Sequence, residues 1–119
     1  MGDELARRLV PDELWEVVAP LIPPARVRPQ GGGRARADDR AIFTAITFVL
    51  TSGVPWRGVP HVFGVKPPTV HRRFAEWVSL GLWQRLHRET VDRFGAGKEV
   101  SWTSALVEGV VARTCEDSK

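Results

Sequence analysis

Two neighbouring arginines, Arg72 and Arg73, lie in a segment that opens with Pro67 and Pro68. The planar guanidinium of arginine can bond guanine O6 and N7 together, and it also pairs with phosphate. If the segment is a helix, each residue advances it by about 100°. One side then carries Thr69, Arg72, Arg73 and Glu76, and the other carries Val70, Phe74, Trp77 and Val78. The first side predicts a surface that contacts nucleic acid, and the second predicts a surface that packs on a core.

The residues before this segment predict a helix-turn-helix. His61–Phe63 has room for one short helical turn, Gly64 follows, and the next helix is expected from near Lys66 to about Leu80. The N-terminal half of the second helix of such a unit enters the major groove of DNA. Thr69, Arg72 and Arg73 are therefore candidate DNA-binding residues, with His71 at the edge of the packed face. The pattern is equally compatible with an amphipathic surface helix whose arginines are solvated.

A second basic feature is the linker 23–37, which combines prolines, a triple glycine and several arginines. Its residues offer hardly any side chain that can pack. Arg34 and Arg36 could lie along phosphates or enter a narrow minor groove, as the arms of other DNA-binding domains do. A solvated linker kept extended by its charges is the alternative.

The segments around these candidates predict helices that hold them in place. Pro11, followed by two acidic residues, favours a helix start. Asp38 is expected to cap a strongly apolar helix that stops at Gly53. A last helix over 82–94 has core-facing spacing at Trp83, Leu86, Thr90 and Phe94. The predicted fold class is all-α, a compact helical domain.

The end of the chain has a different pattern. Residues 105–111 are rich in valine and resemble a short strand, although no partner strand is evident. The expected fold is therefore all-α with a short, strand-like C-terminal tail.

Length and composition narrow the class of protein. A chain of 119 residues suffices for one compact domain, and a net charge of +3 does not by itself indicate a nucleic-acid partner. Cys115 is the single cysteine, so an internal disulfide is excluded, and zinc-ligand spacing is absent. The start is acidic where a signal peptide is basic, and the apolar segment 41–50 is too short to span a bilayer. We expect a cytoplasmic protein with no metal site and no membrane partner.

Six stretches, taken together, resemble a known family. They are Pro11-Asp12-Glu13-Leu14-Trp15, Pro23-Pro24, Gly32-Gly33-Arg34 with Ala37-Asp38-Asp39-Arg40, Leu50-Thr51-Ser52-Gly53 with Trp56-Arg57, Phe63-Gly64-Val65, and Val70-His71-Arg72-Arg73-Phe74 with Trp77. Their order and spacing over about residues 9–109 are similar to the N-terminal domain of the transposases of insertion-sequence family five, the IS4/IS5-like DDE transposases. The resemblance implies a bacterial domain that recognises the terminal inverted repeats of a mobile element.

The resemblance also implies what should follow the domain. In this family a ribonuclease-H-like catalytic domain comes next, and its first acidic residue aligns with Glu108, where the family has aspartate. The chemistry needs three carboxylates from distant segments to hold two metal ions, and only residues 109–119 follow Glu108. We therefore expect 1–97 to be the DNA-binding domain and 98–119 the start of a catalytic domain that does not fold independently. Glu108 is expected to be inactive, and Mg²⁺ is expected only in the intact family enzymes.

Lys66 departs from the family at the N-cap of the helix that carries Arg72, where a hydroxyl residue is usual. This loses a cap worth about 1 kcal/mol but adds a cation beside the expected phosphates. Lys66 joins the candidate DNA-binding residues.

The favoured function is binding of double-stranded DNA at the ends of an insertion sequence by a chain without a catalytic domain. One alternative is a truncated regulatory subunit that pairs with an intact transposase and inhibits it through an exposed tail, residues 99–119. A homo-oligomer is a further possible assembly. Another is one part of a DNA strand transferase completed by a second polypeptide. The expected location is the cytoplasm, at the nucleoid.

Overall fold

The computed structural model describes residues 7–22, 38–95 and 97–117, and every regular element in these ranges is a helix. The prediction of an all-α domain is confirmed. The longer helices are α2 (Asp12–Val18), α3 (Asp39–Ser52), α4 (Pro67–Ser79), α5 (Leu82–Phe94) and α6 (Lys98–Asp117), and the short 3-10 turns are η1 (Ala19–Leu21), η2 (Trp56–Gly58) and η3 (His61–Phe63).

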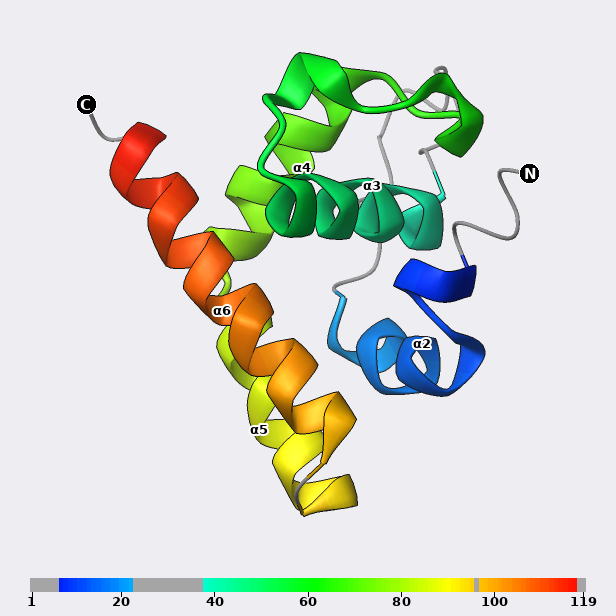
Figure 1. Ribbon diagram of the computed structural model, residues 1–119, viewed down its shortest axis with the longest axis vertical. Coiled ribbons are helices and arrows are strands. Elements are labelled where there is room, and N and C mark those ends of the chain that lie inside the picture. The colour runs from blue at the N-terminus through cyan, green and yellow to red at the C-terminus, as the bar shows by residue number, and fades with distance from the viewer. Residues whose placement is uncertain (1–6, 23–37, 96, 118–119) are drawn as a thin grey trace, which may run out of the picture.

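Helix α3 runs through the middle of the domain (Figure 1). The Asp38 side chain accepts a hydrogen bond from the Ala41 amide at 3.0 Å, and Gly53 ends the helix with a φ of 77°. Both predicted caps are confirmed. The buried side chains of α3 occupy most of its circumference, because neighbouring helices cover it on several sides: Ile42, Phe43, Thr44, Ala45, Ile46, Thr47 and Val49.

Helix α2 is tied to the start of α3 by a charged side chain. Arg40 donates from Nη2 to the carbonyl of Val10 at 2.9 Å and to the carboxylate of Asp12 at 2.6 Å. The guanidinium also lies 6.0 Å from the ring centre of Trp15. The Asp12 carboxylate is well exposed, so the pair contributes mainly to orientation and little to stability.

Helices α4 and α5 are separated by Leu80 and by Gly81, which adopts a φ of 71°. Their facing sides bring Phe74 and Trp77 against Trp83, with ring centres 5.3 and 6.2 Å apart. Trp83, Leu86 and Thr90 are buried as predicted. Phe94 was expected in the core but is 39% exposed at the last position of α5.

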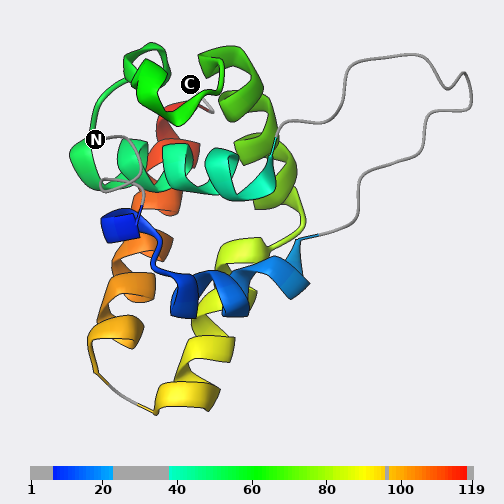
Figure 2. The same cartoon turned by 90° about the vertical axis from the view of Figure 1, so that its right-hand side faces the viewer.

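The strand predicted at 105–111 is wrong. This segment lies within the 20-residue helix α6, which runs beside α5 in both views (Figures 1 and 2). The buried residues Thr103, Leu106 and Val110 are three and four positions apart and therefore share one face of a helix. The valine-rich composition favours a strand, but a lone strand would leave its backbone unpaired, whereas a helix satisfies its own hydrogen bonds and buries this face.

A polar network joins α5 to α6. Thr103 Oγ1 lies 2.9 Å from His87 Nδ1 and 2.9 Å from Thr90 Oγ1, and Thr90 Oγ1 lies 2.7 Å from the carbonyl oxygen of His87. Thr103 Oγ1 also lies 3.1 Å from the Val100 carbonyl oxygen, so its single hydrogen has more than one acceptor within reach. The network gives the buried hydroxyls of Thr90 and Thr103 hydrogen-bond partners on both helices.

Replacing Gly109 with alanine tests the helical state of α6. The added Cβ would lie 3.4 Å from Leu50 Cβ, which is ordinary contact. We expect the free energy of unfolding in urea to rise by about 0.5–1 kcal/mol, because glycine weakens a helix interior. Gly53→Ala is the control and should lower stability, because Gly53 has a positive φ. A lower stability in Gly109→Ala would contradict the α6 assignment.

Candidate nucleic-acid interface

The start of α4 offers few backbone donors to an anion. Pro67 and Pro68 occupy the first two helical positions and have no N–H, and the Val70 amide already bonds the Lys66 carbonyl at 3.0 Å. Lys66 is the N-cap, as predicted, and its side chain makes no capping hydrogen bond. Recognition of a phosphate at this end of α4 would therefore depend on cationic side chains, and Lys66 is exposed there.

The outward face of α4 is centred on Arg72. Val70, Phe74 and Trp77 are buried on the opposite side, which confirms the predicted packing face. Arg72 is exposed, and Thr69 is half-buried at the edge of this face. The exposed neighbours of Arg72 on the outward side are Pro68, Ala75 and Ser79, which are short or compact, and the acidic Glu76, four residues further along α4.

The prediction that Arg73 shares this free face is wrong. Arg73 is 5% exposed, pairs through Nη2 with the carboxylate of Asp39 at the start of α3, and lies 5.1 Å over the ring of Trp77. One residue turns a helix by about 100°, so Arg73 falls between Val70 and Trp77 on the side that meets α3. Arg73 therefore joins two helices inside the domain.

His71 is exposed but is not isolated. Its ring stacks on Trp56 of η2 with centres 5.0 Å apart and planes inclined by 20°, and Trp56 in turn lies 4.7 Å from Phe74. The sequence placed His71 at the edge of the packed face but did not identify Trp56 as its partner. A tryptophan in a connector otherwise rich in proline and glycine was the available signal.

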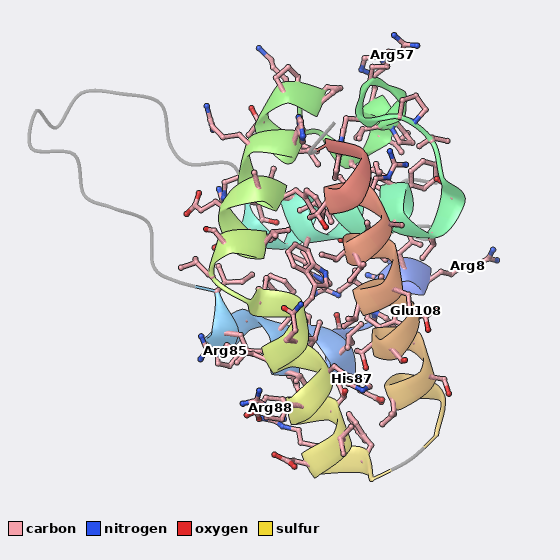
Figure 3. All side chains as sticks on the ribbon, turned by 90° about the vertical axis from the view of Figure 1, so that its left-hand side faces the viewer. Arg8, Arg57, Arg85, His87, Arg88 and Glu108 are labelled. Atoms are coloured by element: carbon pink, nitrogen blue, oxygen red, sulfur yellow. The ribbon has the colours of Figure 1, made fainter. Side chains whose placement is uncertain are left out.

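Other exposed arginines were not singled out from the sequence. Arg57 belongs to η2, and Arg85 and Arg88 project from the same side of α5 (Figure 3). The spacing of three residues between Arg85 and Arg88 was the signal that places them on one helical face. Arg34 and Arg36, the candidates in the linker, lie outside the described residues.

The family resemblance predicted Glu108 at the end of a strand. It lies instead within α6, where its side chain is exposed (Figure 3). Within the described ranges, no three histidine, cysteine or acidic side chains are grouped so that they could hold a metal ion. Nor does any described helix have the length and apolar character needed to cross a membrane.

The fold and site define a small helical domain with a buried aromatic core and, on α4, an exposed polar face that carries Arg72 and Glu76. Residues 10–87 match the model of a protein family described as "Putative transposase of IS4/5 family (DUF4096)". The chain belongs to this family, as its resemblance to the IS4/IS5-like transposases predicted.

A curated relative supports the same assignment. The chain is 34% identical over 106 residues to an uncharacterized 16.2 kDa protein of insertion element IS402 from Burkholderia cepacia. The match covers 87% of this chain and 72% of the relative. No solved structure matches the chain.

Proposed function

We propose that this domain binds double-stranded DNA at the terminal inverted repeats of an insertion sequence. In this proposal η3, the turn at Gly64 and α4 act as a helix-turn-helix, with α4 in the major groove. Membership of a transposase family supports DNA as the partner, since such enzymes must find the ends of their element.

The observation that carries the proposal is the position of Arg72. It is exposed at the centre of the outward face, while the opposite face of α4 is anchored in the core. Ala75 and Ser79 beside it are small, so the α4 backbone can approach the base edges closely. Arg72 then reaches guanine O6 and N7, and Thr69 contacts a neighbouring base or phosphate.

The remaining cations would contact the DNA backbone. Lys66 lies at the N-terminal end of α4, where the helix dipole adds a favourable field for phosphate. Arg85 and Arg88 add two exposed cations on one side of α5, which follows α4 after two residues (Figure 3). Arg34 and Arg36 would follow the phosphates or enter the minor groove. Arg73 is left out of this set because it is paired with Asp39.

We propose no catalytic role for Glu108, because it lies within an exposed helical segment and no described carboxylates group with it around a metal position. Mg²⁺ is proposed only for intact members of the family, and the site of action is the bacterial cytoplasm, at the nucleoid. The burial of Leu106 and Val110 gives less support to inhibition of an intact transposase through a free tail.

Fluorescence anisotropy with labelled duplexes tests the proposal. The protein should bind a duplex of the element's terminal repeat more tightly than a shuffled duplex of equal composition. The double variant Arg34→Ala/Arg36→Ala should weaken binding to both duplexes equally. It should also reduce the slope of log K against log salt by about 0.9 for each phosphate that the variant no longer neutralises. Arg85→Ala/Arg88→Ala should behave in the same way.

Equal affinity of the parent for the repeat end and the shuffled duplex would contradict the proposed function. A slope that does not change in either double variant would remove those two arginines from the interface without affecting the role of α4.

A further inference from the structure

The C-terminal half of α6 contacts the connector that leads into α4. Arg113 donates from Nη2 to the carbonyl oxygen of Val54, a residue 59 positions earlier in the chain. Figure 3 shows the last turns of α6 at the same end of the molecule as Arg57 of this connector. The contact therefore joins the end of α6 to the segment between α3 and α4.

The same guanidinium begins a series of ring contacts that ends on the outward side of α4. The Cζ atom of Arg113 lies 5.7 Å from the ring centre of Trp56, a distance at which a cation is attracted to an indole face. Trp56 stacks on His71 and contacts Phe74 at 5.0 and 4.7 Å. His71 directly precedes Arg72 in α4. Arg113 is therefore connected to the outward face through Trp56 and His71.

Trp56 packs against the edge of the hydrophobic core, and the backbone that carries it is a single 3-10 turn. The backbone bonds next to Trp56 run from Gly58 N–H to the Pro55 carbonyl at 2.8 Å and from Val59 N–H to the Trp56 carbonyl at 3.2 Å. Trp56 Nε1 is buried without a hydrogen-bond partner, so the indole is held by ring contacts. Arg113 adds both a hydrogen bond to the connector and a contact to that ring.

The anchoring of α6 does not depend on Arg113. Leu106 is 1% exposed and Val110 is 3% exposed, and both belong to the hydrophobic core. Removal of the Arg113 side chain should therefore leave α6 in place, and the effect on the connector can be measured separately.

We infer that Arg113 is a positioning residue for DNA recognition: through Trp56 and His71 it sets the orientation of the outward face of α4. This inference rests on the proposed DNA-binding function. If Arg113 has this role, α6 connects the proposed DNA-contacting helix α4 to any polypeptide that follows α6. The segment expected to begin a catalytic domain thus supports the DNA-binding surface.

The test compares Arg113→Ala with Arg113→Lys, which keeps a donor for the Val54 carbonyl, and with Arg93→Ala, which removes an equal charge from the exposed end of α5. The ring-proton NMR shifts of His71 are read without DNA, because stacking on Trp56 displaces them from free-histidine values. Affinity, salt slope and thermal unfolding are measured on each variant.

We expect Arg113→Ala to move the His71 resonances towards free-histidine values and to weaken binding to the repeat end by about two- to thirtyfold, a range typical of residues that act through others. The salt slope should not change, because Arg113 makes no phosphate contact. Arg113→Lys should recover part of the affinity, and Arg93→Ala should match the parent.

Three results would overturn this inference. Unchanged His71 shifts would show that Arg113 does not hold the stack, and an unchanged affinity would show that the stack does not matter. A salt slope lower by about one would make Arg113 a direct phosphate contact. In each case the proposed DNA-binding function still stands if the unmodified protein prefers the repeat end to the shuffled duplex. If the unmodified protein lacks that preference, both the proposed function and the inference about Arg113 are contradicted.

Discussion

Arg73→Ala is expected to lower the free energy of unfolding by about 3 kcal/mol, because it removes a buried charged hydrogen bond worth about 1.5–3 kcal/mol and buried methylenes worth about 0.8 kcal/mol each. The Asp39 carboxylate left behind is 35% exposed and can be hydrated, which keeps the destabilisation below that of a fully buried pair. Urea unfolding followed by tryptophan fluorescence measures the change.

A double-mutant cycle separates the ion pair from the packing. The coupling energy between Arg73→Ala and Asp39→Ala should reach about 1 kcal/mol or more, since the side chains are in direct contact. Arg73→Met should be milder than Arg73→Ala, because methionine fills the space over Trp77 and does not bury the Nε group that lacks a partner. A coupling energy near zero would contradict a role for this pair in joining α3 to α4.

Arg72→Ala is expected to weaken DNA binding while leaving stability nearly unchanged, unlike Arg73→Ala, which is expected to lower stability. Its affinity for the repeat end should fall by about 1–3 kcal/mol, or roughly 5- to 150-fold, with relaxed preference at one base pair. Stability should change by less than about 0.5 kcal/mol, because the side chain is exposed and away from the core.

Binding to duplexes with single base-pair changes locates the position that Arg72 contacts. Arg72→Lys is the informative companion variant, since lysine keeps the charge but cannot make two parallel bonds to guanine. It should retain affinity for shuffled DNA and lose most of the preference for the repeat end. If Arg72→Ala binds as the parent does, or if it unfolds as readily as Arg73→Ala, then Arg72 is not the base-contacting residue.

The aromatic and polar contacts show why neighbouring residues differ so much in their expected effects. Arg72 and Arg73 have the same chemistry and adjacent positions, and amphipathic spacing placed both on one face. The boundary between the faces depends on how α4 is rotated against α3, and Asp39 at the start of α3 determines which arginine is buried. Helical spacing alone does not supply that rotation.

The limits of α3 and the start of α4 were predictable from the sequence, because these features depend on local chemistry. Asp38 caps α3, Gly53 ends it in a left-handed conformation, and the Pro67–Pro68 pair opens α4, as expected. Each of these positions acts within a few residues of itself, so its effect does not depend on the rest of the fold. Family membership was likewise recognisable from spaced motifs.

The tertiary structure decided the features that require contacts between distant segments. The valine-rich run at 105–111 is helical because Leu106 and Val110 find a core to cover, and local β-propensity yields to that burial. Trp56 meets His71, and Arg113 meets Val54, across separations that no local pattern encodes. Side-chain burial and pairing depend on which helices meet. The sequence predicted both arginines as candidates, and the packing determined that Arg72 is exposed and Arg73 is buried.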